Sequence, residues 1–167
     1  MARDEEFTQF VVARGTSLRR TAYLMTGQWA DAEDLTQTAL SRLYLAWPRV
    51  RLEGAEAYAR TILTRSFVDS RRRFWHREQP AAELPEQVGP ADLTDERLDL
   101  GRALALLPRS YRAVLVLRFW DDMTVQEVAD VLQVSPGTVK SRTSWALDAM
   151  RAAMGTDAVL IEAEAQS

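Results

Sequence analysis

The chain has 167 residues and a net charge of −3, with 21 basic and 24 acidic residues. The absence of cysteine and the single histidine, His76, argue against disulfides, zinc sites and catalysis of the Cys or Ser-His-Asp type. Because no apolar run could span a membrane and the first residues lack a signal-peptide pattern, we expect a cytoplasmic protein without membrane insertion.

Basic and acidic residues are segregated along the chain. Residues 1–78 hold 13 arginines and 10 acidic residues, whereas residues 79–94 hold three acidic residues and no basic one. The stretch from 78 to 94 also contains three prolines and few large apolar residues, which is typical of an extended linker. We therefore expect a folded region on each side of it, and an acidic tail over 155–167.

Apolar residues recur at helical spacing through the first region, and no segment shows a strand pattern. The first helix should end near Gly27, and a second should run from about 29 to 47 with Asp31 as its N-cap. A third is expected from about 56 to 76. The fold class is therefore predicted to be all-α.

The second expected helix carries a polar strip opposite its apolar face. Such a strip on a rigid helix is either plain surface or a docking surface for another protein. Its members are Asp34, Gln37, Thr38 and Ser41.

The stretch "YARTILTRSFVDSRRRFWHRE", residues 58–78, interleaves arginines with aromatic residues. Aromatic rings stack on unpaired bases and guanidinium groups hold the backbone, so single-stranded DNA is one ligand that this composition fits. The alternative is a solvated basic face with Phe67 and Trp75 in the core.

Two helices are expected in the second region, over 98–107 and 110–120, separated by Pro108. The following stretch "TVQEVADVLQVSPGTVKSR", residues 124–142, begins with the capping-box pattern of Thr124 and Glu127. Ser135 and Pro136 are a favourable N-cap and first residue for a second helix. Two helices joined by so short a turn predict a helix-turn-helix motif.

On the second helix of this motif, apolar residues cluster on one side and small or basic residues on the other. Small residues let a helix enter the major groove, where lysine and arginine reach phosphates and guanine edges. The alternative is an ordinary solvated surface. The outward residues are Gly137, Thr138, Lys140, Ser141, Arg142, Ser144 and Trp145.

Taken in order, these stretches resemble an extracytoplasmic-function (ECF) sigma factor of bacterial RNA polymerase, most like the actinobacterial SigE family. The resemblance extends from "FTQFVVARGTSLRRTAYLMTG" through "DAEDLTQTAL" and "LPRSYRAVLVLRFWDDMT" to "VSPGTVKSR". It implies sigma domain 2 over 4–77, a linker over 78–94 and sigma domain 4 over 95–154. The implied partners are core RNA polymerase, promoter DNA and, as a further candidate, an anti-sigma factor. It implies no catalytic residue, metal or cofactor in the chain itself.

The resemblance also assigns residues to three surfaces. Core polymerase would be bound by Asp34, Gln37, Thr38 and Ser41. The −10 element would be melted and captured by Arg51, Tyr58, Arg60, Thr61, Arg65, Arg72 and Arg73. The −35 duplex would be read by Arg118, Thr138, Lys140, Ser141, Arg142, Ser144 and Trp145.

The chain departs from the family pattern at four positions. Gln133 stands where the motif usually has glycine, Arg65 replaces a common asparagine, Trp145 occupies an often basic position, and Asp148 follows it on the same face.

Two rival functional classes remain open. One is a stand-alone helix-turn-helix regulator, and the other is a nucleic-acid enzyme binding Mg²⁺ through the carboxylates of residues 31–34.

Overall fold

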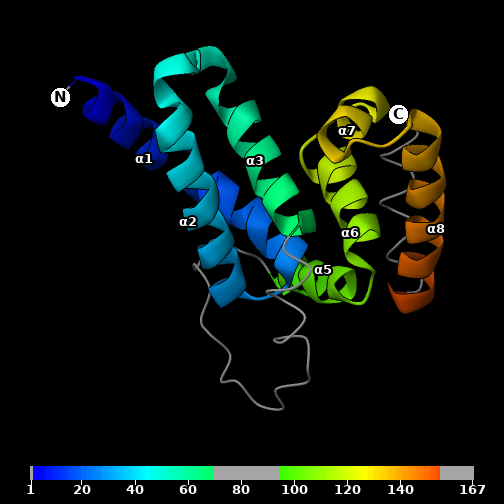
Figure 1. Ribbon diagram of the computed structural model, residues 1–167. Helices are drawn as coiled ribbons and strands as arrows, with labels where there is room; N and C mark the ends of the chain where they lie inside the picture. Colours follow the sequence, from blue (N-terminus) through cyan, green and yellow to red (C-terminus); the bar gives the residue numbers. More distant parts are fainter. Residues whose placement is uncertain (1, 70–94, 155–167) are drawn as a thin grey trace. The chain divides into compact units, whose positions relative to one another are not determined.

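The computed structural model describes residues 2–69 and 95–154, in which every regular element is a helix and no strand occurs (Figure 1). Contacts between helices divide the chain into two units, residues 1–90 and 91–167. The prediction of an all-α fold with two helical domains is confirmed. The expected linker over 78–94, the tail over 155–167 and the end of the third helix lie outside the described residues.

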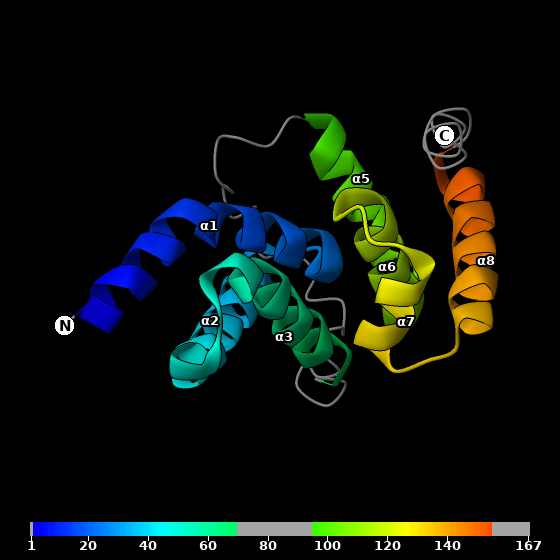
Figure 2. The same cartoon turned by 90° about the horizontal axis from the view of Figure 1, so that it is seen from above.

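The first unit contains α1 (Ala2–Thr26), α2 (Trp29–Ala46) and α3 (Ala55–Asp69). Two short 3₁₀ turns, η1 (Trp47–Arg49) and η2 (Leu52–Gly54), connect α2 to α3, which lie side by side and antiparallel (Figure 1). Each helix packs against the other two (Figure 2). The side chains buried between them include Phe10, Leu18, Met25, Leu35, Leu43, Trp47, Leu63 and Phe67.

The junction between α1 and α2 corrects the predicted N-cap. Gln28, with extended backbone, occupies the N-cap position, and Asp31 is instead buried inside the first turn of α2. The helix begins early because Gly27, at φ 75°, turns the chain at once. Trp29 can then stack on Tyr23 with ring centroids 4.2 Å apart. An acidic residue in the first turn still faces the positive end of the helix dipole.

The start of α1 is tied to the end of α2 through Tyr44. Its hydroxyl donates to Oδ1 of Asp4 at 2.7 Å, and Arg3 donates to its backbone carbonyl at 2.9 Å. The hydrogen bond to the Asp4 carboxylate, with the repulsion that this charge exerts on a phenolate, raises the pKa of Tyr44. These contacts hold together two chain segments that are far apart in sequence.

The second unit contains α5 (Asp95–Ala105), α6 (Arg109–Leu115), α7 (Val125–Leu132) and α8 (Pro136–Met154). The helix expected over 110–120 continues from α6 as a π-helical turn, η3 (Val116–Trp120). Helix α8 contacts α5, α6 and α7. The buried residues among them include Leu104, Val114, Leu117, Val128, Val139, Ala146 and Met150.

Arg112 is a charged residue within this second core, with only 6% of its surface exposed. Its Nη2 donates to the carbonyl of Leu107 at 3.0 Å and lies 3.5 Å from that of Ala105. It therefore satisfies carbonyl groups that the end of α5 and the break at Pro108 leave without helical partners. Within the described ranges, none of the helices is both long and apolar enough to cross a membrane.

Candidate nucleic-acid interface

The helix-turn-helix is formed by the local signals that predicted it. The Thr124 hydroxyl accepts from the backbone N–H of Glu127 at 3.1 Å, and the Glu127 carboxylate accepts from that of Thr124 at 2.9 Å. Ser135 caps α8 by accepting from the N–H of Thr138 at 3.1 Å. Gln133 adopts the left-handed conformation, with φ 56° and ψ 45°. The turn therefore places a non-glycine residue where glycine is usually favoured.

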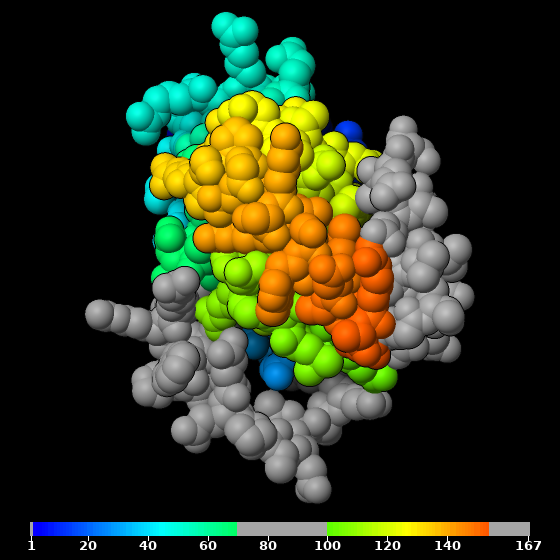
Figure 3. Space-filling model, turned by 90° about the vertical axis from the view of Figure 1, so that its right-hand side faces the viewer, coloured from blue at the N-terminus to red at the C-terminus, as the bar shows by residue number. Residues whose placement is uncertain are grey.

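Helix α8 has one buried and one open face. Val139, Ala146 and Met150 are buried, whereas Lys140, Ser141 and Ser144 are exposed. Figure 3 shows α8, in orange, lying at the surface of the second unit next to α7 in yellow. These six residues lie on the sides that helical periodicity predicts, whereas Arg142, predicted to point outward, is half-buried.

Beside the open face lies a groove of about 350 Å³ between α8 and the η3–α7 segment. Arg118 on one wall donates to the carbonyl of Met123 at 2.5 Å, and Arg151 pairs with Asp148 at 2.9 Å. The groove thus gathers three basic side chains and one carboxylate. It is lined by Arg118, Val125, Lys140, Thr143, Ser144, Leu147, Asp148 and Arg151.

Two of the predicted −35 residues turn toward α6 instead of this groove. Trp145, half exposed, lies with its ring centroid 4.5 Å from that of Tyr111, and the Arg142 guanidinium carbon lies 6.0 Å from the same ring. Both side chains therefore lie beside the Tyr111 ring. Tyr111 was not predicted from the sequence, because no local pattern links it to residues some 30 positions later.

Among the residues predicted for the −10 element, Arg51 is the N-cap of η2, and Tyr58, Arg60, Thr61 and Arg65 lie on α3. Arg51 and Arg65 are exposed, Tyr58 is 44% exposed, and Thr61 is half-buried with its hydroxyl donating to the carbonyl of Ala57 at 3.0 Å. Phe67 is fully buried, so it belongs to the core and cannot stack on a base. Arg72, Arg73 and Trp75 lie outside the described residues.

Arg60 differs from its expected environment. Within 58–78 the sequence gives six arginines only Asp69 and Glu78 as acidic neighbours. In the structure Nη2 of Arg60 lies 2.8 Å from Oε1 of Glu56, one turn earlier, and Nε of Arg14 lies 3.3 Å from Oε2 of the same carboxylate. The spacing from Glu56 to Arg60 could have been noticed, because residues four apart on a helix are neighbours.

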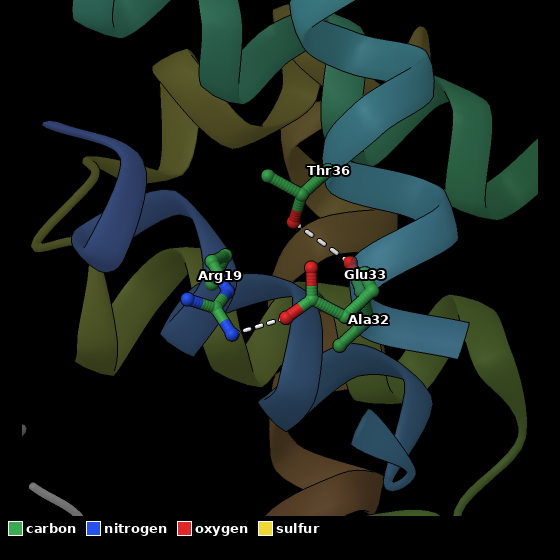
Figure 4. A network of polar contacts seen from close by, with 4 residues as sticks. All are labelled: Arg19, Ala32, Glu33 and Thr36. Carbon is green, nitrogen blue, oxygen red and sulfur yellow. Dashed lines mark hydrogen bonds and ion pairs between the residues drawn. The ribbon is translucent and has the colours of Figure 1, made fainter. Parts of the chain in front are cut away.

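The polar strip of α2 is open, as expected. Asp34, Gln37 and Ser41 are exposed, and Thr38 is half-buried with its hydroxyl donating to the carbonyl of Asp34 at 2.9 Å. Nearby, Glu33 forms an ion pair with Arg19 of α1 (Figure 4). This pair joins α1 to the first turns of α2.

The carboxylates of residues 31–34 do not form a metal site. Asp31 is buried, Glu33 pairs with Arg19, and Asp34 is exposed. Within the part of the chain that the structure describes, no group of His, Cys, Asp or Glu side chains could hold a metal ion. The reading as a Mg²⁺-dependent enzyme therefore has no support from this helix.

Residues 10–77 match the family model for sigma-70 region 2, and residues 97–150 match the model for sigma-70 region 4. The chain is 35% identical over 154 residues to the RNA polymerase sigma-E factor of Streptomyces coelicolor, covering 87% of this chain and 84% of that protein. It is 32% identical over 145 residues to the ECF RNA polymerase sigma factor SigL of Mycobacterium tuberculosis, covering 80% of each. The chain belongs to the ECF RNA polymerase sigma factors.

As a member of this family, the protein binds core RNA polymerase and promoter DNA and directs transcription initiation. The prediction made from the sequence is confirmed at this level. Sigma factors are not catalytic enzymes. The rival reading as a stand-alone regulator is not favoured, because the first unit matches sigma region 2.

A solved structure has the same fold. The sigma factor RpoE from Bartonella quintana, crystallised with the anti-sigma factor NepR, superposes with a TM-score of 0.71 at 23% identity. The similarity covers 92% of this chain and 99% of RpoE. At this identity the comparison establishes the architecture, while residue roles must be argued from this chain.

Proposed function

We propose that the two units of this sigma factor divide promoter recognition between them. The first unit, domain 2 over 4–77, binds core polymerase through the polar strip of α2 and captures the melted −10 strand along η2 and α3. The second, domain 4 over 95–154, reads the −35 element as duplex through α8. Each surface uses the residues that the family resemblance implies for it. Such work requires a cytoplasmic location, where core polymerase and the chromosome lie.

The observation that carries this proposal is the open face of α8 behind a capped turn. Lys140, Ser141 and Ser144 are exposed on the first turns of a helix whose opposite face is buried. A recognition helix contacts base edges with its N-terminal residues, so small and basic side chains there suit the major groove. The groove between α8 and the η3–α7 segment adds the positive charges of Lys140 and Arg118 beside this face, where duplex phosphates would pass.

The −10 role rests on a different chemistry. Tyr58 offers a half-exposed ring and Arg51 and Arg65 offer exposed guanidinium groups in the same segment. Aromatic rings stack on unpaired bases at about 1–3 kcal/mol each, and arginine holds the backbone. A melted strand therefore finds both of its recognisable parts, base faces and phosphates, on one surface.

In vitro transcription tests the proposal. Core polymerase from Streptomyces coelicolor, with and without the full chain, is offered a library of random promoter fragments, and the transcripts are sequenced. We expect starts that depend on the chain and share a −35 and a −10 motif. Replacing Ser141 and Ser144 with alanine should relax only the −35 motif, and replacing Tyr58 with alanine only the −10 motif. Loss of both motifs together in either variant would contradict the division of labour.

A further inference from the structure

We infer that Glu56 restrains the capture of single-stranded DNA by holding two arginines, Arg14 and Arg60, that would otherwise pair with phosphates. The inference rests on the proposed −10 role of α3 and adds a residue that opposes binding. No part of the sequence pattern assigns a function to Glu56 or Arg14.

The geometry is that of one carboxylate shared by two helices. Oε1 of Glu56 lies 2.8 Å from Nη2 of Arg60 on α3, and Oε2 lies 3.3 Å from Nε of Arg14 on α1. The Glu56 and Arg60 side chains are 27% and 24% exposed, so this pair is largely withdrawn from water, while Arg14 is 55% exposed. An ion pair shielded in this way is screened by salt less than a fully exposed one.

A carboxylate and a phosphodiester are alternative acceptors for the same guanidinium group. A DNA phosphate that approaches Arg60 must therefore displace Glu56 or accept a weaker, shared hydrogen bond. Glu56 also occupies the second residue of α3, where the positive end of the helix dipole favours a negative charge. The carboxylate therefore lies among two guanidinium groups and the positive end of the helix, and it offsets one of the two guanidinium charges.

This restraint favours specificity over affinity. Indiscriminate binding of single strands depends almost wholly on phosphate contacts, whereas capture of a promoter strand also gains from its bases. Weaker phosphate contacts lower the affinity for both kinds of strand. They leave base recognition with a larger share of the free energy of binding to a promoter strand. A built-in opposing charge is a known way to discriminate between ligands that share most of their contacts.

The test uses holoenzyme assembled from Streptomyces coelicolor core polymerase and the full chain. A fluorescein-labelled single strand of mixed sequence is titrated at several salt concentrations, and fluorescence anisotropy gives Kd. Glu56→Gln keeps the shape of the side chain and removes its charge. We expect Kd to fall about fivefold at low salt, in keeping with the strength of a partly exposed ion pair. The slope of log K against log salt should steepen by about 0.7, the value of one more phosphate contact on a single strand.

Glu6→Gln is the matched control, since Glu6 is an exposed acid of α1 for which no role is proposed. It removes the same charge from the same unit and should leave the slope unchanged. A third variant, Arg60→Met, completes a cycle: in that background Glu56→Gln should gain markedly less than fivefold. Assembly with core polymerase, checked by native gels, should be equal for all variants.

Equal effects of Glu56→Gln and Glu6→Gln would overturn the inference, because bulk charge alone would then explain the change. Weaker binding by Glu56→Gln would overturn it too, and would mean that the carboxylate orients Arg60 for binding. If wild-type holoenzyme binds the strand no better than core polymerase alone, the proposed −10 role itself fails, and that outcome is visible before any variant is measured.

Discussion

Three arginines of the first unit lie against carboxylates, whereas three of the second lie against backbone carbonyls or an aromatic ring, although Arg3 of the first unit also donates to a carbonyl. In the first unit Arg19 pairs with Glu33, and Arg14 and Arg60 share Glu56. In the second, Arg112 and Arg118 donate to backbone carbonyls and Arg142 lies against a tyrosine ring, although Arg151 pairs with Asp148. Carbonyls and rings orient a guanidinium group without cancelling its charge, whereas a carboxylate does both.

Formal charge is therefore a poor guide to which unit attracts DNA more strongly. The first 78 residues carry three more arginines than acids, while residues 95–154 are balanced at eight basic and eight acidic residues. Ion pairs inside a unit leave its net charge unchanged, but they determine which guanidinium groups a phosphate can reach without displacing a carboxylate. Substitutions in the two units test this contrast.

The largest effect is expected for the most deeply buried of these arginines. Arg112→Met removes the donor to the Leu107 carbonyl. The buried carbonyl then lacks this hydrogen bond, which should lower the free energy of unfolding by about 2–3 kcal/mol. The counterpart in the first unit is Arg42, exposed, which donates to the Ser66 hydroxyl at 2.9 Å. Arg42→Met should cost less than about 1 kcal/mol. Urea unfolding followed by circular dichroism measures both, and equal losses would show that burial does not separate the two arginines.

The sequence predicted the helix boundaries that depend on residues close together in the chain. The caps at Thr124 and Ser135, the break at Pro108 and the end of α1 at Gly27 all depend on residues within a few positions of each other. Helical periodicity likewise separated the buried and open faces of α8, since the period of a helix fixes which residues share a side.

Long-range pairings could not be read in this way. Tyr111 with Trp145, Arg14 with Glu56 and Asp4 with Tyr44 join residues that only the packing of helices brings together. One error was local: Asp31 suits an N-cap by residue type, but the turn at Gly27 and the stacking of Trp29 start the helix earlier. Residue preference is a weak guide where tertiary packing sets the boundary.

The units also differ in the residues that they place in left-handed turns, and this difference should have opposite signs on mutation. Gln133, at φ 56°, is strained by its side chain, so Gln133→Gly should stabilise the second unit by about 1 kcal/mol. Gly27, at φ 75°, is not strained, so Gly27→Ala should destabilise the first unit by about 1 kcal/mol. Thermal unfolding of the two variants compares them directly. A loss of stability in Gln133→Gly would mean that the Gln133 side chain makes a compensating contact.

A smaller effect is expected for the DNA contacts of the second unit. Lys140→Ala should weaken holoenzyme binding to duplex carrying the −35 motif severalfold and reduce the salt slope by about 0.9, the value of one phosphate on B-DNA. Trp145→Leu should leave that slope unchanged, because an aromatic side chain releases no counterion. Fluorescence anisotropy at several salt concentrations gives both quantities. A reduced slope in Trp145→Leu would indicate that the ring positions Arg142 on a phosphate.

The smallest effect belongs to the tie between α1 and α2 in the first unit. The Asp4 carboxylate raises the pKa of Tyr44 above its ordinary value of 10.0, because it accepts a hydrogen bond from the neutral phenol and repels a phenolate. The neutral tyrosine is therefore the form that stabilises the fold. Its contribution is fully present below the ordinary pKa and is lost as pH rises through the raised one. Tyr44→Phe removes both the hydrogen bond and the titration. Wild type should be slightly more stable than the variant at neutral pH, and the difference in free energy of unfolding should shrink to zero in strongly alkaline solution. Subtracting the free energy of unfolding of Tyr44→Phe from that of wild type at each pH removes the contributions of all other titrating groups. A difference that stays constant with pH would show that the phenol and the Asp4 carboxylate do not interact in solution.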